Sequence, residues 1–225
     1  MKRTKLRDRL LPDYTRGEEI FNMVSHIVGG GFGVIALISC LIKAFITGGA
    51  YEIVGSFIYG LSMIILYTMS SVYHGLIPET AKKVMQILDH CTIFVLIAGT
   101  YTPITLTVLR EANPTLGWTI FGFVWGVSAI GITLNAIDLK KYNVFSIICY
   151  LALGWCIIFS GKTALTAIPR PPFFWLLAGG IAYTVGAVLY GIAGKKVVRY
   201  MHSVFHIFVV LGSILQYFAI ILYII

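Results

Sequence analysis

Charged residues are scarce in this chain of 225 residues. Aspartate, glutamate, lysine and arginine make up 12% of it, whereas hydrophobic residues make up 58% and the mean hydropathy is +0.89. Soluble domains carry about 25% charged and about 45–50% apolar residues. The composition excludes a water-soluble globule, which could not hide so much apolar surface, and a disordered chain. It predicts an integral membrane protein.

Cysteine is also scarce, and cysteine pairs at metal-binding spacing are missing. The four cysteines, at positions 40, 91, 149 and 156, lie in apolar stretches and form no Cys-x-x-Cys pair. The sequence therefore favours neither a disulfide framework nor a thiolate zinc site. No polar stretch is long enough for a soluble domain. We expect a basic cytoplasmic tail over residues 1–20 and a single membrane domain over residues 21–225.

Apolar stretches of about 20 residues, the length that an α-helix needs to cross a bilayer, occur seven times. Turn-forming and charged residues concentrate in the short gaps between them. We therefore predict an all-α fold, an integral membrane bundle of seven transmembrane helices. The first stretch is longer than the apolar part of a signal peptide and should remain as a helix. The predicted spans are Val24–Ile46, Ile53–Ile77, Val84–Leu109, Leu116–Ile137, Tyr142–Ser160, Phe173–Ala193 and Tyr200–Ile225.

The distribution of lysine and arginine predicts the orientation of the bundle. Thirteen of the 17 basic residues fall in the N-terminal tail and in the second, fourth and sixth gaps. Such an excess marks the cytoplasmic side, so we expect a cytoplasmic N-terminus and an extracytoplasmic C-terminus. The net charge of +8 is then a topology signal that also attracts anionic lipid, and no motif supports nucleic-acid binding. The thirteen are Lys2, Arg3, Lys5, Arg7, Arg9, Arg16, Lys82, Lys83, Lys140, Lys141, Lys195, Lys196 and Arg199.

Several ionisable residues lie inside the predicted spans, where each is costly and asks for an explanation. In the predicted orientation, four of them lie at one depth, roughly 5–10 Å from the cytoplasmic end of the hydrocarbon region. The orientation inferred from the basic residues does not require the four to lie at one depth. Their common depth therefore predicts one shared site. The four are His74, Asp89, His202 and His206.

The spacing of the histidines favours zinc. His202 and His206 are four residues apart, so both imidazoles project from one helical face and can bind one metal. His74 would supply a third nitrogen, and three histidines plus one water form the pattern of catalytic zinc sites. We expect Asp89 to act as a general base or to orient that water. Ser70, one turn before His74, would hold the water or an oxyanion.

Each of these residues also has a simpler interpretation. A membrane histidine more often makes a helix–helix hydrogen bond than a metal bond, and an isolated His-x-x-x-His pair is a weak motif. Asp89 could be an interfacial charge paired with Lys82 or Lys83. For His26 and His90 we expect packing roles, with His26 as the reserve ligand.

Five segments carry a resemblance to a known family: 18–22 (EEIFN), 70–74 (SSVYH), 88–90 (LDH), 99–103 (GTYTP) and 202–206 (HSVFH). Together they resemble the hemolysin III family, within the progestin and adipoQ receptor superfamily, which is grouped with the alkaline ceramidases among membrane metal-dependent hydrolases. The resemblance covers nearly the whole chain. It implies seven helices, a cytoplasmic N-terminus and zinc near the inner leaflet. The family's zinc histidines fall on His74, His202 and His206, its aspartate on Asp89 and its serine on Ser70.

Two functions from different classes remain open. The first is a zinc-dependent hydrolase of a lipid amide or ester, whose substrate enters sideways between helices. The second is a non-catalytic receptor-like or cytolytic protein with structural zinc, in which Asp89 would be the fourth ligand. A transporter is less favoured, because its polar residues should meet at the membrane midplane. In either case we expect a multi-pass protein of a bacterial plasma membrane whose partners are membrane lipids.

Overall fold

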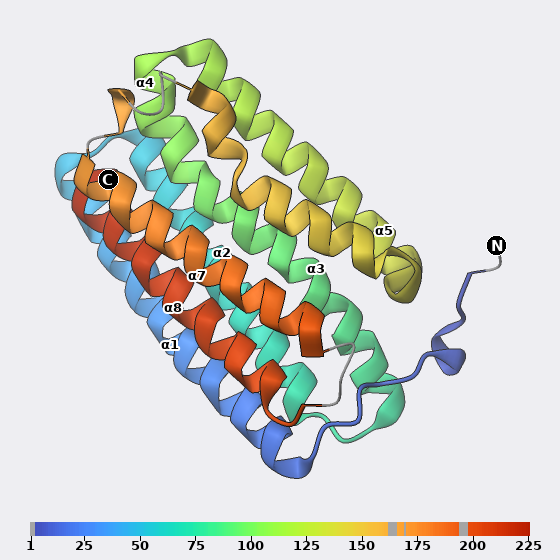
Figure 1. The fold of residues 1–225 in the computed structure, drawn as a ribbon. Helices are drawn as coiled ribbons and strands as arrows, with labels where there is room; N and C mark the ends of the chain where they lie inside the picture. Colours follow the sequence, from blue (N-terminus) through green and yellow to red (C-terminus); the bar gives the residue numbers. More distant parts are fainter. Residues whose placement is uncertain (1–2, 162–165, 169, 194–197) are drawn as a thin grey trace.

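The computed structural model describes residues 3–161, 166–168, 170–193 and 198–225, and the regular elements in these ranges are all helical (Figure 1). The long helices lie side by side in an elongated bundle. They are α1 (Arg16–Thr47), α2 (Ala50–Gly75), α3 (Glu79–Ile104), α5 (Pro114–Gly154), α7 (Arg170–Ala193) and α8 (Met201–Tyr223). The short elements are η1 (Leu6–Asp8), η2 (Thr105–Leu109), α4 (Arg110–Ala112) and η3 (Cys156–Ser160).

Six helices in the described ranges are long and apolar enough to cross a membrane. They confirm an all-α protein of the membrane class. The predicted number of seven is not confirmed, because α5 contains the fourth predicted span and most of the fifth, whose last residues lie in η3. Four of the basic residues that were counted for or against the predicted orientation lie outside the described residues. They are Lys2, Lys162, Lys195 and Lys196.

The helix α5 contains a break at Asp138, whose backbone is extended (φ −157°, ψ 91°). Asn135, before the break, accepts a hydrogen bond from Ser146 Oγ at 2.6 Å and donates one to Tyr150 Oη at 3.3 Å. Residues fifteen positions apart in a straight helix would be about 22 Å apart. The two arms, 114–137 and 139–154, therefore fold back on each other, as Figure 1 shows.

Side-chain caps set where two of the long helices begin. At the start of α1, Thr15 Oγ1 accepts from the Glu18 backbone N–H at 3.3 Å, and Glu18 Oε2 accepts from the Thr15 backbone N–H at 2.8 Å. This reciprocal pair satisfies two N–H groups that the helix leaves unpaired. At the start of α5, Asn113 Oδ1 accepts from the Leu116 N–H at 3.1 Å, and Pro114 occupies the first helical position.

The helix α3 is the most buried of the six candidate spans. Pro103 lies inside it, and the chain continues from Ile104 into η2, a π-helix. Proline lacks an N–H and disturbs the regular hydrogen-bond ladder. Thr107 Oγ1 donates to the Pro103 carbonyl at 2.6 Å, and Thr105 Oγ1 donates to the Tyr101 carbonyl at 2.9 Å. The wider π-helical turn and these threonine hydroxyls follow directly on the proline.

Glycines permit the close crossing of α1 and α2. A Cβ atom at Gly60 would lie 2.5 Å from Leu37 Cα, and one at Gly29 would lie 2.7 Å from the Tyr67 ring. Small residues let helix backbones approach in this way in membrane proteins. Gly31 belongs to the same glycine run as Gly29 but faces open space, so only part of that run forms the contact.

We predict that Gly60→Ala lowers the melting temperature of the purified protein. The added methyl group would meet the backbone of α1 and force the helices apart, and overpacking typically costs about 1–3 kcal/mol. Gly31→Ala is the matched control, which should leave the melting temperature unchanged or raise it, because alanine favours helix. Equal melting temperatures for the two variants would contradict the tight crossing.

Candidate metal centre

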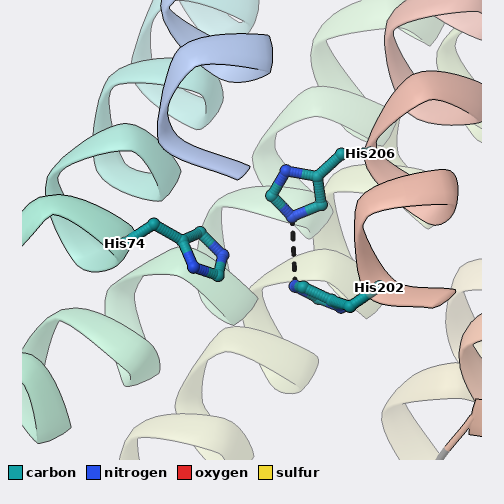
Figure 2. A group of neighbouring side chains, drawn as sticks. All are labelled: His74, His202 and His206. Carbon is teal, nitrogen blue, oxygen red and sulfur yellow. Dashed lines mark hydrogen bonds between the residues drawn. The ribbon is translucent and has the colours of Figure 1, made fainter. Parts of the chain in front are cut away.

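Three histidines from two helices meet at one end of the bundle. His74 lies in the last turn of α2, and His202 and His206 occupy the first two turns of α8. One ring nitrogen from each lies within 4.8 Å of the others, so the three could hold a metal ion. Figure 2 shows the two rings from α8 facing the ring from α2. The structure thus brings together the three residues that the sequence predicts as ligands.

The arrangement of the ring nitrogens fits a shared cation. His202 Nε2 and His206 Nε2 lie 3.1 Å apart, close to the separation of roughly 3.3 Å between two nitrogens bound tetrahedrally to one zinc ion. His74 Nε2 and His202 Nδ1 are buried and have no hydrogen-bond partner in the described part of the chain. Buried polar atoms are normally paired, and a cation bound by His202 Nε2 and His206 Nε2 would supply the partner that His74 Nε2 lacks.

A contact outside the three histidines holds the ring of His74. Its Nδ1 donates to Glu19 Oε2 at 2.6 Å, and Glu19 Oε1 lies 2.8 Å from Lys82 Nζ. Sequence reasoning gave Glu19 no role of its own, because a glutamate in the first turn of a helix is usually explained by the helix dipole. The resemblance of residues 18–22 to the family was the signal that could have found it.

His206 is held by the first helix as well. Its Nδ1 lies 3.5 Å from Ser25 Oγ, and its ring stacks on that of His26 with centroids 3.7 Å apart. Both nitrogens of His26 are buried and lack a hydrogen-bond partner among the described residues. His26 is not in the group of three that meets within 4.8 Å.

Asp89 has a different neighbour from those that the sequence suggested. Its Oδ2 lies 3.5 Å from His90 Nδ1. Lys82 and Lys83, the partners considered for it, form their ion pairs with glutamates instead. Among the ion pairs of the described residues, Asp89 is therefore not paired with either lysine.

Asp89 and Ser70 line a cavity of about 380 Å³ whose wall also includes His202 and His206. Ser70 Oγ is buried and has no hydrogen-bond partner in the described ranges. Hydrogen bonds between these two residues and the three histidines are not found there. Ser70, Asp89, His202 and His206 share the cavity wall without a direct network, and His74 is not part of that wall. Most of the remaining wall is apolar and includes Leu66, Ile93, Leu96, Ile97, Trp155 and Phe205.

The segment before α1 covers the histidines from one side. The ring of Tyr14 stacks on that of His202, with centroids 5.0 Å apart and planes 17° apart. The same ring lies 5.8 Å from that of His74. Burial raises the pKa of the Tyr14 phenol, so it stays protonated at neutral pH. The sequence gave no signal for this contact, because Tyr14 lies in a stretch expected to be a tail.

Comparison with known proteins agrees with the resemblance. The family described as "Haemolysin-III related" matches residues 14–217. The chain belongs to this family. It is 36% identical over 207 residues to "Hemolysin-3" of Bacillus cereus, which covers 92% of both chains. It is 35% identical over 210 residues to the "Hemolysin-3 homolog" of Bacillus subtilis (strain 168), which covers 93% of this chain and 96% of the relative.

A more distant relative extends the family beyond bacteria. The chain is 27% identical over 195 residues to the human "Monocyte to macrophage differentiation factor", covering 83% of this chain and 77% of the relative. That protein is adipoQ-receptor-like. The match therefore supports the wider superfamily that the sequence motifs suggested.

We predict that His74→Ala, His202→Ala and His206→Ala each lose bound metal, because each removes one of three nitrogens. The measurement is the metal content per protein chain after purification. His90→Ala is the matched control and should keep the wild-type content, since His90 lines the same cavity but lies outside the group of three. Full metal content in any of the three variants would refute the three-histidine site.

Proposed function

We propose that His74, His202 and His206 hold Zn²⁺ and that the centre makes this protein a hydrolase of a lipid amide or ester. The observation that carries the proposal is the convergence of three histidine nitrogens, two of whose rings, His202 and His206, line a mostly apolar cavity together with Asp89 and Ser70. Neutral imidazole is a preferred ligand of zinc, and three protein ligands leave a position open for chemistry.

Zinc, when bound, would polarise a substrate carbonyl and make a water molecule acidic enough to react near neutral pH. Asp89 is the base that takes the proton of the attacking water. Its carboxylate is mostly shielded from solvent, with a side-chain exposure of 14%, and lies outside the group of three histidines. Ser70 offers a hydroxyl without another partner, which can donate to an oxygen that gains negative charge during the reaction.

The cavity supports a lipid as the substrate. Its wall is mostly apolar away from the histidines, and its volume of about 380 Å³ can hold part of an acyl chain. Burial of apolar surface contributes about 25 cal/mol per Å², so the chain would supply much of the binding energy. The polar groups at one part of the wall would receive the amide or ester.

A second candidate is a receptor-like or cytolytic protein without catalysis, and the hemolysin names of the Bacillus relatives support its cytolytic form. In that case zinc is structural, and a structural site normally has four protein ligands. Asp89 is the carboxylate that would have to complete it. The two candidates therefore assign different roles to the same residue.

We also propose seven crossings of a bacterial plasma membrane, with a cytoplasmic N-terminus. The reversal of α5 at Asp138 and the basic excess on one side support this topology. A reporter fused after Ile225 that is active only outside the cytoplasm should give a signal, and a reporter fused at Lys140 should not. A signal from a cytoplasm-specific reporter at Ile225 would contradict the topology.

We expect Asp89→Asn to keep zinc and the melting temperature while hydrolysis falls about 10²–10⁴-fold, because a neutral amide cannot take the proton. The measurements are zinc content, melting temperature and hydrolysis of an N-acyl sphingoid lipid and a lysophospholipid by purified protein. Glu111→Gln is the control, because it makes the same kind of change at an exposed carboxylate. Its zinc content, melting temperature and rate of hydrolysis should match those of the wild type. Loss of zinc in Asp89→Asn would favour the structural candidate, and a wild type inactive on both lipids would argue against the hydrolase.

A further inference from the structure

The helix α1 contributes none of the three clustered histidines, yet its first turn touches one of them. Both carboxylate oxygens of Glu19 make polar contacts. Oε2 accepts from His74 Nδ1 at 2.6 Å, and Oε1 lies 2.8 Å from Lys82 Nζ. The His74 side chain is fully buried, and the Glu19 side chain is 18% exposed. An ion-paired carboxylate in such a setting is a strong and directional acceptor.

We infer that Glu19 is the positioning residue of the metal centre, acting through His74. A neutral imidazole that donates its Nδ1 proton to a carboxylate presents Nε2 as a lone pair. In His74 this is the nitrogen that has no partner in the described chain. The carboxylate thus selects the tautomer, fixes the ring plane and makes Nε2 a better ligand. This inference rests on the proposed metal site.

Lys82 completes the arrangement by holding Glu19 in place. Besides the carboxylate, its ammonium donates to the carbonyl of Leu76 at 3.2 Å and to that of His74 at 3.4 Å. Both carbonyls lie at the C-terminal end of α2, where a cation is favourable. One lysine from α3 therefore ties the carboxylate from α1 to the end of the helix that carries His74. The chain Lys82–Glu19–His74 joins three helices at the centre.

The positive charge of Lys82 also explains how Glu19 can remain ionised here. A lone carboxylate at a shielded position would be disfavoured, whereas one beside an ammonium at 2.8 Å is stabilised. The charge on Glu19 can then favour a cation bound at the other end of the His74 ring. A neutral acceptor in its place would hold the ring but give weaker support to the cation.

The experiment measures the dissociation constant for Zn²⁺ by competition with a chelator, using purified full-length protein stripped of metal. Glu19→Ala should bind about 10–100-fold more weakly, the usual effect of removing such a partner, and Glu19→Gln should fall between it and the wild type. Glu79→Gln is the matched control, because Glu79 forms an ion pair with Lys83 at 2.6 Å within α3. This control should bind as the wild type does.

A spectroscopic readout separates positioning from a structural role. At saturating Co²⁺, the visible absorption bands should shift in both Glu19 variants and stay unchanged in Glu79→Gln, because only the Glu19 variants change the acceptor at Nδ1 of the ligand His74. Wild-type affinity and spectrum in Glu19→Ala would overturn the inference. If that variant does not fold, wild-type affinity and spectrum in Glu19→Gln would overturn it. A wild-type protein that binds neither ion would instead refute the proposed metal site.

Discussion

The arrangement of the bundle at the end that carries the three histidines depends on the free-energy cost of burying imidazole nitrogens away from water. His74 Nε2, His202 Nδ1 and both nitrogens of His26 lack hydrogen-bond partners in the described part of the chain. Each unsatisfied buried group typically costs about 1–3 kcal/mol, and no water in the bilayer core relieves it. Three helices nevertheless bring these rings together. A cation bound by His74, His202 and His206 would give His74 Nε2 a partner and link α2 to α8, and its binding would add to the stability of the fold.

The helix α1 makes that link possible although it supplies none of the three clustered histidines. Near the centre, Glu18 Oε1 accepts from the Tyr200 backbone N–H at 2.6 Å, and Ser203 Oγ donates to Asn22 Oδ1 at 2.7 Å. At the far end of the same helix pair, Lys43 Nζ donates to the Ile221 carbonyl at 2.6 Å. Polar contacts thus fix the register of α1 against α8 at both ends. Because apolar packing alone is non-directional, these contacts determine the height at which Ser25 and His26 of α1 meet His206 of α8.

The membrane class and the group of three histidines could be predicted from the sequence, because two physical rules apply to it directly. Apolar length indicates a membrane helix, and an ionisable residue inside one indicates a site. These rules gave the membrane class and the group His74, His202 and His206, which the structure brings together. Helical periodicity explains the pair on α8, and the shared depth explains the third member from α2.

The remaining features depend on tertiary contacts that no local pattern encodes. Asp138 looked like part of a loop, but its side chain accepts from the Lys141 backbone N–H at 3.2 Å, so the second arm of α5 begins directly after the break. The stacking of Tyr14 on His202 joins residues nearly the whole chain apart. Glu19 has an adequate local explanation as a first-turn acid, which hides its contact with His74.

In the proposed function, different parts of the cavity wall supply the chemistry and the binding energy of the substrate. Polar groups such as Ser70, Asp89 and His206 share a wall with many more apolar side chains. Each buried methylene group of a substrate would contribute about 0.8 kcal/mol without any directional preference. Such uniform binding strengthens the complex but does not by itself accelerate the reaction. Under the proposed function, selection among acyl chains therefore depends on the apolar wall, whereas any acceleration must come from the few polar groups that respond to charge developing on the carbonyl.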